Sequence, residues 1–186
     1  MKTQKEITIS GVGGQGMILC GTLIAEAAAV HEHKKATLSS EYGVETRGTF
    51  AKSDVIVSDE EIYFPDVTEP DLVVCLHQVA YARYSGKIGD ALLLFNSDEV
   101  TPDADADGVH KGLPITQMAK ELGNPQTANI LTMGIIAGLT KVITPEGAKE
   151  AIRKFFKGKS DKVIALNEKA FDLGYEEGAT LQEDAI

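Results

Sequence analysis

Short apolar runs alternate with longer stretches of helical periodicity along the chain, a pattern that predicts an α/β fold. The runs that predict strands are Glu6–Ser10, Ala36–Leu38, Thr49–Val57 (a long strand or one arm of a hairpin), Leu72–Leu76 and Ala91–Phe95. The last two are continuously apolar, as is typical of central strands that are buried on both faces. We therefore expect a Rossmann-like, single-domain three-layer sandwich, with a mostly parallel or mixed sheet and helices on both faces.

Helical periodicity fills the segments between these runs and the C-terminal part of the chain. Helices are predicted from Met17 to about His31, near Gln126–Leu139, from Thr144-Pro145 to Gly158, and from Ser160 toward Gly174 and Gly178. We predict one domain over residues 1–178 and a frayed tail over residues 179–186.

Small residues are concentrated in the helix predicted near Gln126–Leu139, where Ala128, Gly134, Ala137 and Gly138 allow another element to approach closely. That element can belong to the same domain or to another subunit. The sequence leaves both interpretations open.

Composition restricts the class of protein. The chain has 186 residues, 43% of them hydrophobic, which suits one globular domain. No stretch reaches the roughly 20 apolar residues of a membrane span, and the N-terminal residues contain no apolar signal region. The formal net charge of −10 opposes binding to nucleic acid or to an anionic membrane. We expect a cytoplasmic protein with neither of these partners.

Groups that could carry chemistry are few. Cys20 and Cys75 lie inside apolar runs, which favours buried thiols, and the absence of any C-x-x-C pair argues against an iron–sulfur cluster on this chain. His31 and His33 are two residues apart, which does not place them on one helical face as zinc ligands. The sequence therefore predicts no catalytic residue and no metal site, and any electron transfer would involve another subunit.

A glycine-rich turn, Gly11-Val12-Gly13-Gly14-Gln15-Gly16, directly follows the first predicted strand and opens a helix. Gly11 suits a tight turn, Gly13 admits a ligand close to the backbone, and Gly16 lets the helix pack closely on the strand. Because a helix N-terminus offers unpaired N–H groups, the turn predicts a phosphate-binding cradle. The candidate binding residues here are Gly11, Gly13, Gly14, Gln15 and Gly16.

The spacing also fits the dinucleotide fingerprint G-x-G-x-x-G, which requires an acidic residue about 20 residues later at the end of the second strand. The available residue, Glu41, lies in another glycine-bearing loop and is a poor candidate. Two alternatives therefore stay open: a free-standing NAD(P)-binding or other nucleotide-binding protein, and glycines that serve packing alone.

The second loop, Tyr42-Gly43-Val44-Glu45-Thr46-Arg47-Gly48, supplies two further candidates. Arg47 can bind a phosphate or carboxylate bidentately, contact another subunit, or pair locally with Glu41 or Glu45. Tyr42 can offer an aromatic face and a hydroxyl, and it can equally serve packing, as can Gln15. Loops at the carboxyl ends of strands converge, so four segments are expected to line one pocket or one interface: Gly11–Gly16, Ser39–Gly48, His77-Gln78 and Asn96-Ser97-Asp98.

Four passages together make the chain resemble the gamma subunit of the 2-oxoacid:ferredoxin oxidoreductases. They are the glycine-rich turn, the Tyr42–Gly48 loop, Ser58-Asp59-Glu60-Glu61-Ile62 with Pro65 and Pro70-Asp71, and Asn129-Ile130-Leu131-Thr132-Met133-Gly134. They occur in the order found in that family, whose members often have proline at the position of Val44 and glycine at that of Thr49.

The resemblance implies a subunit without its own active site. In this family alpha and beta subunits hold thiamine diphosphate and a delta subunit holds the iron–sulfur clusters, so that a 2-oxoacid and coenzyme A yield acyl-CoA, carbon dioxide and reduced ferredoxin. It implies a role in assembly and in forming the coenzyme A side of the complex, with 2-oxoglutarate the preferred substrate. A purely structural module remains an alternative, and the isolated chain is a candidate homodimer.

Overall fold

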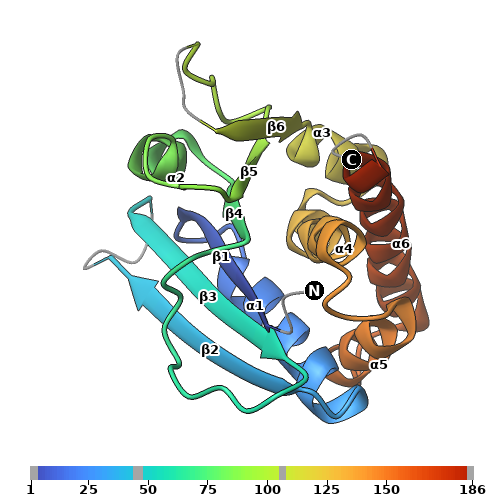
Figure 1. Cartoon of the computed structure of the whole chain (residues 1–186). Coiled ribbons are helices and arrows are strands. Elements are labelled where there is room, and N and C mark those ends of the chain that lie inside the picture. The colour runs from blue at the N-terminus through green and yellow to red at the C-terminus, as the bar shows by residue number, and fades with distance from the viewer. Residues whose placement is uncertain (1–3, 44–47, 105–107, 184–186) are drawn as a thin grey trace.

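The computed structural model describes residues 4–43, 48–104 and 108–183, and within them one six-stranded sheet has the order β2-β3-β1-β4-β5-β6 (Figure 1). β1 runs parallel to β4, and β5 is parallel to both of its neighbours, whereas β3 is antiparallel to β1 and β2. The predicted mixed sheet is therefore confirmed. The strands are β1 (Gln4–Val12), β2 (Lys35–Tyr42), β3 (Phe50–Ser58), β4 (Leu72–Cys75), β5 (Leu92–Asn96) and β6 (Val109–Leu113).

Helices cover both faces of the sheet, as predicted, but unevenly. One face packs against α1 (Met17–Glu26) and α4 (Ala128–Thr140), with α5 (Pro145–Phe155) and α6 (Asp161–Glu183) outside them, whereas α2 (Gln78–Tyr84) lies on the other face (Figure 1). Three short helices complete the described residues: the π-helix η1 (Ala27–His31), α3 (Ile115–Glu121) and the 3₁₀-helix η2 (Pro125–Thr127). No helix in the described ranges is long and apolar enough to cross a membrane.

The central strands are buried on both faces, which explains their continuously apolar sequences. In β4, Val74 packs into the core under α1 and α4, while Val73 and Cys75 pack into the smaller core under α2. Both cysteine thiols are buried and unpaired, as predicted. Burial raises the pKa of the Cys75 thiol to about 12 and that of the Cys20 thiol further still.

The alternative of a hairpin arm at Thr49–Val57 is correct. β2 pairs with β3 along its whole length, and beyond the last pair the Gly43 N–H donates to the Phe50 carbonyl at 3.0 Å. β2 extends beyond the predicted Ala36–Leu38 because β3 satisfies its backbone groups, although the added residues are polar. The edge strand β6 was not predicted, because its sequence, Val-His-Lys-Gly-Leu, has no apolar run.

The interpretation of Gly174 and Gly178 as a helix end is wrong, since α6 continues through both glycines to Glu183 and so includes residues 179–183 of the predicted tail. These glycines face Gly134 and Gly138 of α4. A Cβ on Gly174 would overlap the Leu131 carbonyl oxygen, and a Cβ on Gly178 that of Ile135. The small residues of α4 therefore serve packing within the domain, where two helix backbones touch directly.

Gly178→Ala is expected to lower the free energy of unfolding by about 1–3 kcal/mol, because the added Cβ forces α4 and α6 apart in a packed core. Urea unfolding of both proteins measures the change. The matched control is Gly86→Ala, where a Cβ would meet no atom within 4 Å. Equal stability of the two variants would contradict the described contact.

Neither thiol of the native chain is expected to react with iodoacetamide at pH 8, because only the thiolate is nucleophilic and burial keeps both groups protonated. The unfolded chain loses these protons above about pH 8.5, whereas the Cys75 pKa in the folded chain is about 12. The contribution of this group to stability therefore falls as the pH rises through that interval. Mass spectrometry after alkylation checks the first point, and native labelling of either cysteine would contradict it.

Candidate functional site at the carboxyl edge of the sheet

The carboxyl ends of β1, β4, β5 and β6 meet at one edge of the sheet, where the segments after them surround a hollow of about 470 Å³. Its lining comes from the glycine-rich turn, from the ends of β4 and β5, from the start of α3, from η2 and from the start of α4. The lining residues are Gly14, Gln15, Gly16, Leu76, Asn96, Ile115, Thr116, Pro125, Gln126, Ala128, Asn129 and Thr132.

Glycine is required in the turn for two physical reasons. Gly14 and Gly16 have φ angles of 103° and 77°, a region that side chains disfavour, and Gly16 is the N-cap of α1. A Cβ on Gly16 would also lie 2.6 Å from Nδ2 of Asn129, and a Cβ on Gly11 would overlap Oε1 of Gln15. The close approach expected at Gly16 is thus to α4 rather than to the sheet.

The Gln15 side chain holds the turn together. Its Oε1 accepts from the Val12 N–H at 2.9 Å, and its Nε2 donates to the Leu76 carbonyl at 3.0 Å. The Gly13 N–H donates to the Thr49 carbonyl at 3.0 Å, which ties the turn to the β2–β3 hairpin. Because both ends of its amide are engaged, Gln15 shapes the hollow instead of reaching into it.

Neutral amide and hydroxyl groups form the opposite wall. Asn96 Nδ2 donates to Thr116 Oγ1 at 2.9 Å, which joins the end of β5 to the start of α3. Asn129 Oδ1 accepts from the Ile130 N–H at 2.8 Å, and within the described residues its Nδ2 makes no hydrogen bond. No lysine, arginine or carboxylate belongs to the described lining. The N-termini of α1, α3 and α4, none of which has an acidic residue in its first turn, are thus the sources of positive potential at the hollow.

The predicted site residues divide into four groups. Gly14, Gln15 and Gly16 line the hollow, whereas Gly11 and Gly13 support the turn without lining it. Tyr42 lies outside the lining, at the end of β2, with 69% of its surface exposed. Arg47 lies outside the described residues.

The convergence of four predicted loops is only partly correct. The glycine-rich turn and Asn96 meet at the hollow, but His77 caps α2 by accepting from the Val79 N–H at 3.1 Å, and Gln78 accepts from the Thr101 N–H. Sequence reasoning gave no individual role to Thr116, Gln126 or Asn129. Asn129 could have been noticed because it begins the passage Asn129–Gly134, which resembles the oxidoreductase gamma subunits. Nothing in the sequence pointed to Thr116 or Gln126.

The sheet order counts against a dinucleotide site. In the doubly wound fold the second strand lies beside the first, so that its terminal acid reaches the ribose. Here β3 separates β2 from β1, and Glu41 on β2 faces Lys52 at 3.9 Å instead. The glycine spacing of the dinucleotide fingerprint thus occurs here without the neighbouring second strand that a dinucleotide site requires.

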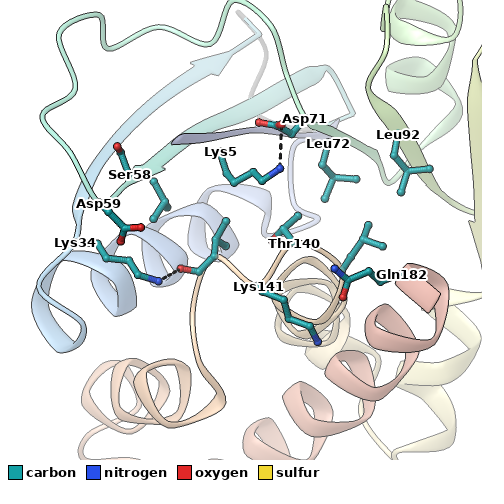
Figure 2. A pocket seen from close by; sticks show the side chains of 13 residues that line it. Lys5, Lys34, Ser58, Asp59, Asp71, Leu72, Leu92, Thr140, Lys141 and Gln182 are labelled. Atoms are coloured by element: carbon teal, nitrogen blue, oxygen red, sulfur yellow. Dashed lines mark hydrogen bonds and ion pairs between the residues drawn. The ribbon is translucent and has the colours of Figure 1, made fainter. Parts of the chain in front are cut away.

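A second hollow, of about 560 Å³, lies at the opposite edge of the sheet (Figure 2). Its cationic groups are engaged by the protein. Lys5 pairs with Asp71 at 3.2 Å, Lys34 pairs with Glu32 and donates to the Val142 carbonyl, and Lys141 lies 4.3 Å from the centre of the Tyr175 ring. These contacts favour a structural role for the three lysines.

Comparison with known proteins identifies relatives of the whole chain. Residues 6–177 match the family model described as pyruvate ferredoxin/flavodoxin oxidoreductase. The 2-oxoglutarate synthase subunit KorC of Methanocaldococcus jannaschii is 39% identical over 95% of both chains. The protein of the same description from Archaeoglobus fulgidus is 33% identical over 100% of this chain and 94% of its own length.

Solved structures agree with these matches. The gamma subunit of a keto/oxoacid ferredoxin oxidoreductase from Geobacter sulfurreducens has a TM-score of 0.79 and 35% identity over 95% of this chain and 99% of its own. A 2-oxoglutarate:ferredoxin oxidoreductase from Magnetococcus marinus shares the fold, with a TM-score of 0.88 and 24% identity over 97% of this chain and 32% of its own. The chain therefore belongs to the pyruvate ferredoxin/flavodoxin oxidoreductase family and is the gamma subunit of a 2-oxoacid:ferredoxin oxidoreductase.

Proposed function

We propose that the complex containing this chain oxidises 2-oxoglutarate and that the chain forms part of its coenzyme A side. In that reaction 2-oxoglutarate and coenzyme A give succinyl-CoA and carbon dioxide, and two electrons pass to ferredoxin. We assign thiamine diphosphate to alpha and beta subunits and the iron–sulfur clusters to a delta subunit. The cytoplasmic location expected from the sequence is part of the same proposal.

The observation that supports the coenzyme A role is the hollow at the carboxyl edge, where a glycine-rich turn at a helix N-terminus faces neutral amides. Coenzyme A carries phosphate groups and an arm with two amide bonds. Backbone N–H groups at the start of α1 suit a phosphate, and the Asn129 amide, whose Nδ2 has no partner among the described residues, suits an amide of the arm. The two chemical classes of the lining thus correspond to the two classes of polar group in the ligand.

The absence of cationic side chains from the described lining sets a limit on affinity. Coenzyme A is polyanionic, and neutral donors alone bind such ligands weakly. We propose that further positive charge comes from Arg47 in the assembled enzyme and from partner subunits. Coenzyme A binding would then depend on assembly, and the isolated chain would bind it weakly.

One observation favours the second candidate function, a purely structural assembly module. The Gln15 amide is engaged by backbone groups at both ends, so the most polar side chain of the turn serves the fold. In such a module the glycines would serve only the close contact with Asn129.

Asn129→Ala in the assembled enzyme is expected to raise the Michaelis constant for coenzyme A about two- to tenfold, which corresponds to one lost hydrogen bond. The Michaelis constant for the 2-oxoacid should stay unchanged. Initial rates of viologen reduction with each substrate varied in turn measure both constants. The control is Gln182→Ala, which removes an amide from the hollow at the opposite edge. Identical constants in wild type and Asn129→Ala, with the subunits fully assembled, would favour the structural module.

The substrate is tested with a panel of 2-oxoacids. Purified complex supplied with coenzyme A is expected to reduce viologen with the highest kcat/KM for 2-oxoglutarate, compared with pyruvate and 2-oxoisovalerate. A higher kcat/KM for either of the other acids would contradict 2-oxoglutarate as the preferred substrate, but it would not affect the assignment of the chain as a gamma subunit.

A further inference from the structure

The segment between β3 and β4, residues 59–71, presents two adjacent aromatic side chains to solvent. Tyr63 is 93% exposed and Phe64 is 59% exposed. We call this segment the aromatic loop. It crosses in front of the β2–β3 hairpin, on the side away from α1, and its two ends lie at the rim of the second hollow, near Asp59 and Asp71 (Figures 1 and 2).

A buried carboxylate fixes the end of the loop that leads into β4. Glu6 of β1 is only 6% exposed, and its Oε2 accepts from the N–H groups of Thr68 and Glu69 at 2.8 and 3.0 Å. Asp71 exchanges two further hydrogen bonds with the Glu6 backbone, of 2.8 and 2.9 Å, and pairs with Lys5. A buried carboxylate is costly unless it is hydrogen-bonded, so moving the Thr68 and Glu69 N–H groups away from Glu6 would be unfavourable. This anchor therefore restricts the loop.

Contacts near the start and middle of the loop restrict it further. The Glu60 N–H donates to Ser58 Oγ at 3.0 Å, and Lys35 pairs with Glu61 at 2.7 Å. Thr37 Oγ1 donates to the Pro65 carbonyl at 3.4 Å, directly after the two aromatic residues. Tyr63 and Phe64 are thus displayed on a backbone that is already ordered, and such preorganisation lowers the entropy lost on binding.

All charged side chains of the aromatic loop itself are negative. Residues 59–71 contain six carboxylates and no lysine or arginine. Asp59, Glu60 and Asp66 have no ion pair within the part of the chain that the structure describes, and all three are exposed. An aromatic anchor with an acidic rim is complementary to an apolar pocket flanked by basic groups.

We propose that the aromatic loop is a contact surface for another subunit of the oxidoreductase, with Tyr63 and Phe64 entering an apolar pocket flanked by lysine or arginine. A second copy of this chain is a poor occupant, because two acidic loops and two chains of net charge −10 repel each other. The loop joins the sheet at the edge opposite to the glycine-rich turn, and none of its residues lines the hollow beside that turn.

The test is the double variant Tyr63→Ser/Phe64→Ser in the full complex, expressed with its other subunits. Native mass spectrometry on dilution measures the fraction of complex that retains this chain. Loss of a paired aromatic anchor is expected to weaken retention about tenfold or more. Phe155→Ser is the matched control, since Phe155 is 50% exposed at the end of α5, and it should retain wild-type assembly.

Two further measurements make the result decisive. The melting temperature of the isolated double variant should match that of wild type, because both side chains are exposed; if it falls, Glu60→Gln/Asp66→Asn replaces it as the informative variant. That variant keeps the aromatic residues and should weaken assembly and reduce its dependence on salt. The proposal is overturned if the complex retains the informative variant as well as it retains the wild-type chain. It is also overturned if the variant loses only the self-association of this chain.

Discussion

The pairing of β1 on both of its edges is the constraint on which the rest of the molecule depends. β1 is antiparallel to β3 on one side and parallel to β4 on the other, so it joins the hairpin half of the sheet to the parallel half. Its carboxyl end becomes the glycine-rich turn, and near its amino end Glu6 fixes the aromatic loop. Both surfaces to which we assign a role are therefore held in place by one buried strand.

Direct contact between backbones is the second organising feature. α4 and α6 touch through Gly134, Gly138, Gly174 and Gly178, and Gly16 brings the start of α1 against Asn129 of α4. Because α4 contacts both α6 and the glycine-rich turn, the helical layer and the hollow at the carboxyl edge share one support. A change in the packing of α4 and α6 would thus be transmitted to Asn129.

The sequence predicted those parts of the fold that have a local signal. The apolar runs identified β1, β4 and β5, and the glycine spacing located the turn that lines the hollow. It failed where tertiary contact overrides local preference: Gly174 and Gly178 read as a helix end because the opposing glycines of α4 are distant in sequence. Glu6 as an anchor, and Thr116 and Gln126 beside the turn, could not be predicted, since each depends on which strands are neighbours.

We regard the chain as a subunit that shapes a site without containing the reacting groups. The most direct test is to purify the tagged chain gently and without oxygen from its own source, and to compare 2-oxoacid-dependent and coenzyme A-dependent viologen reduction by the resulting complex with that by the isolated chain. We expect a thiamine-binding pair of subunits to accompany the active material and the isolated chain to be inactive. An isolated chain that binds a dinucleotide and catalyses its reduction would contradict this view of the chain.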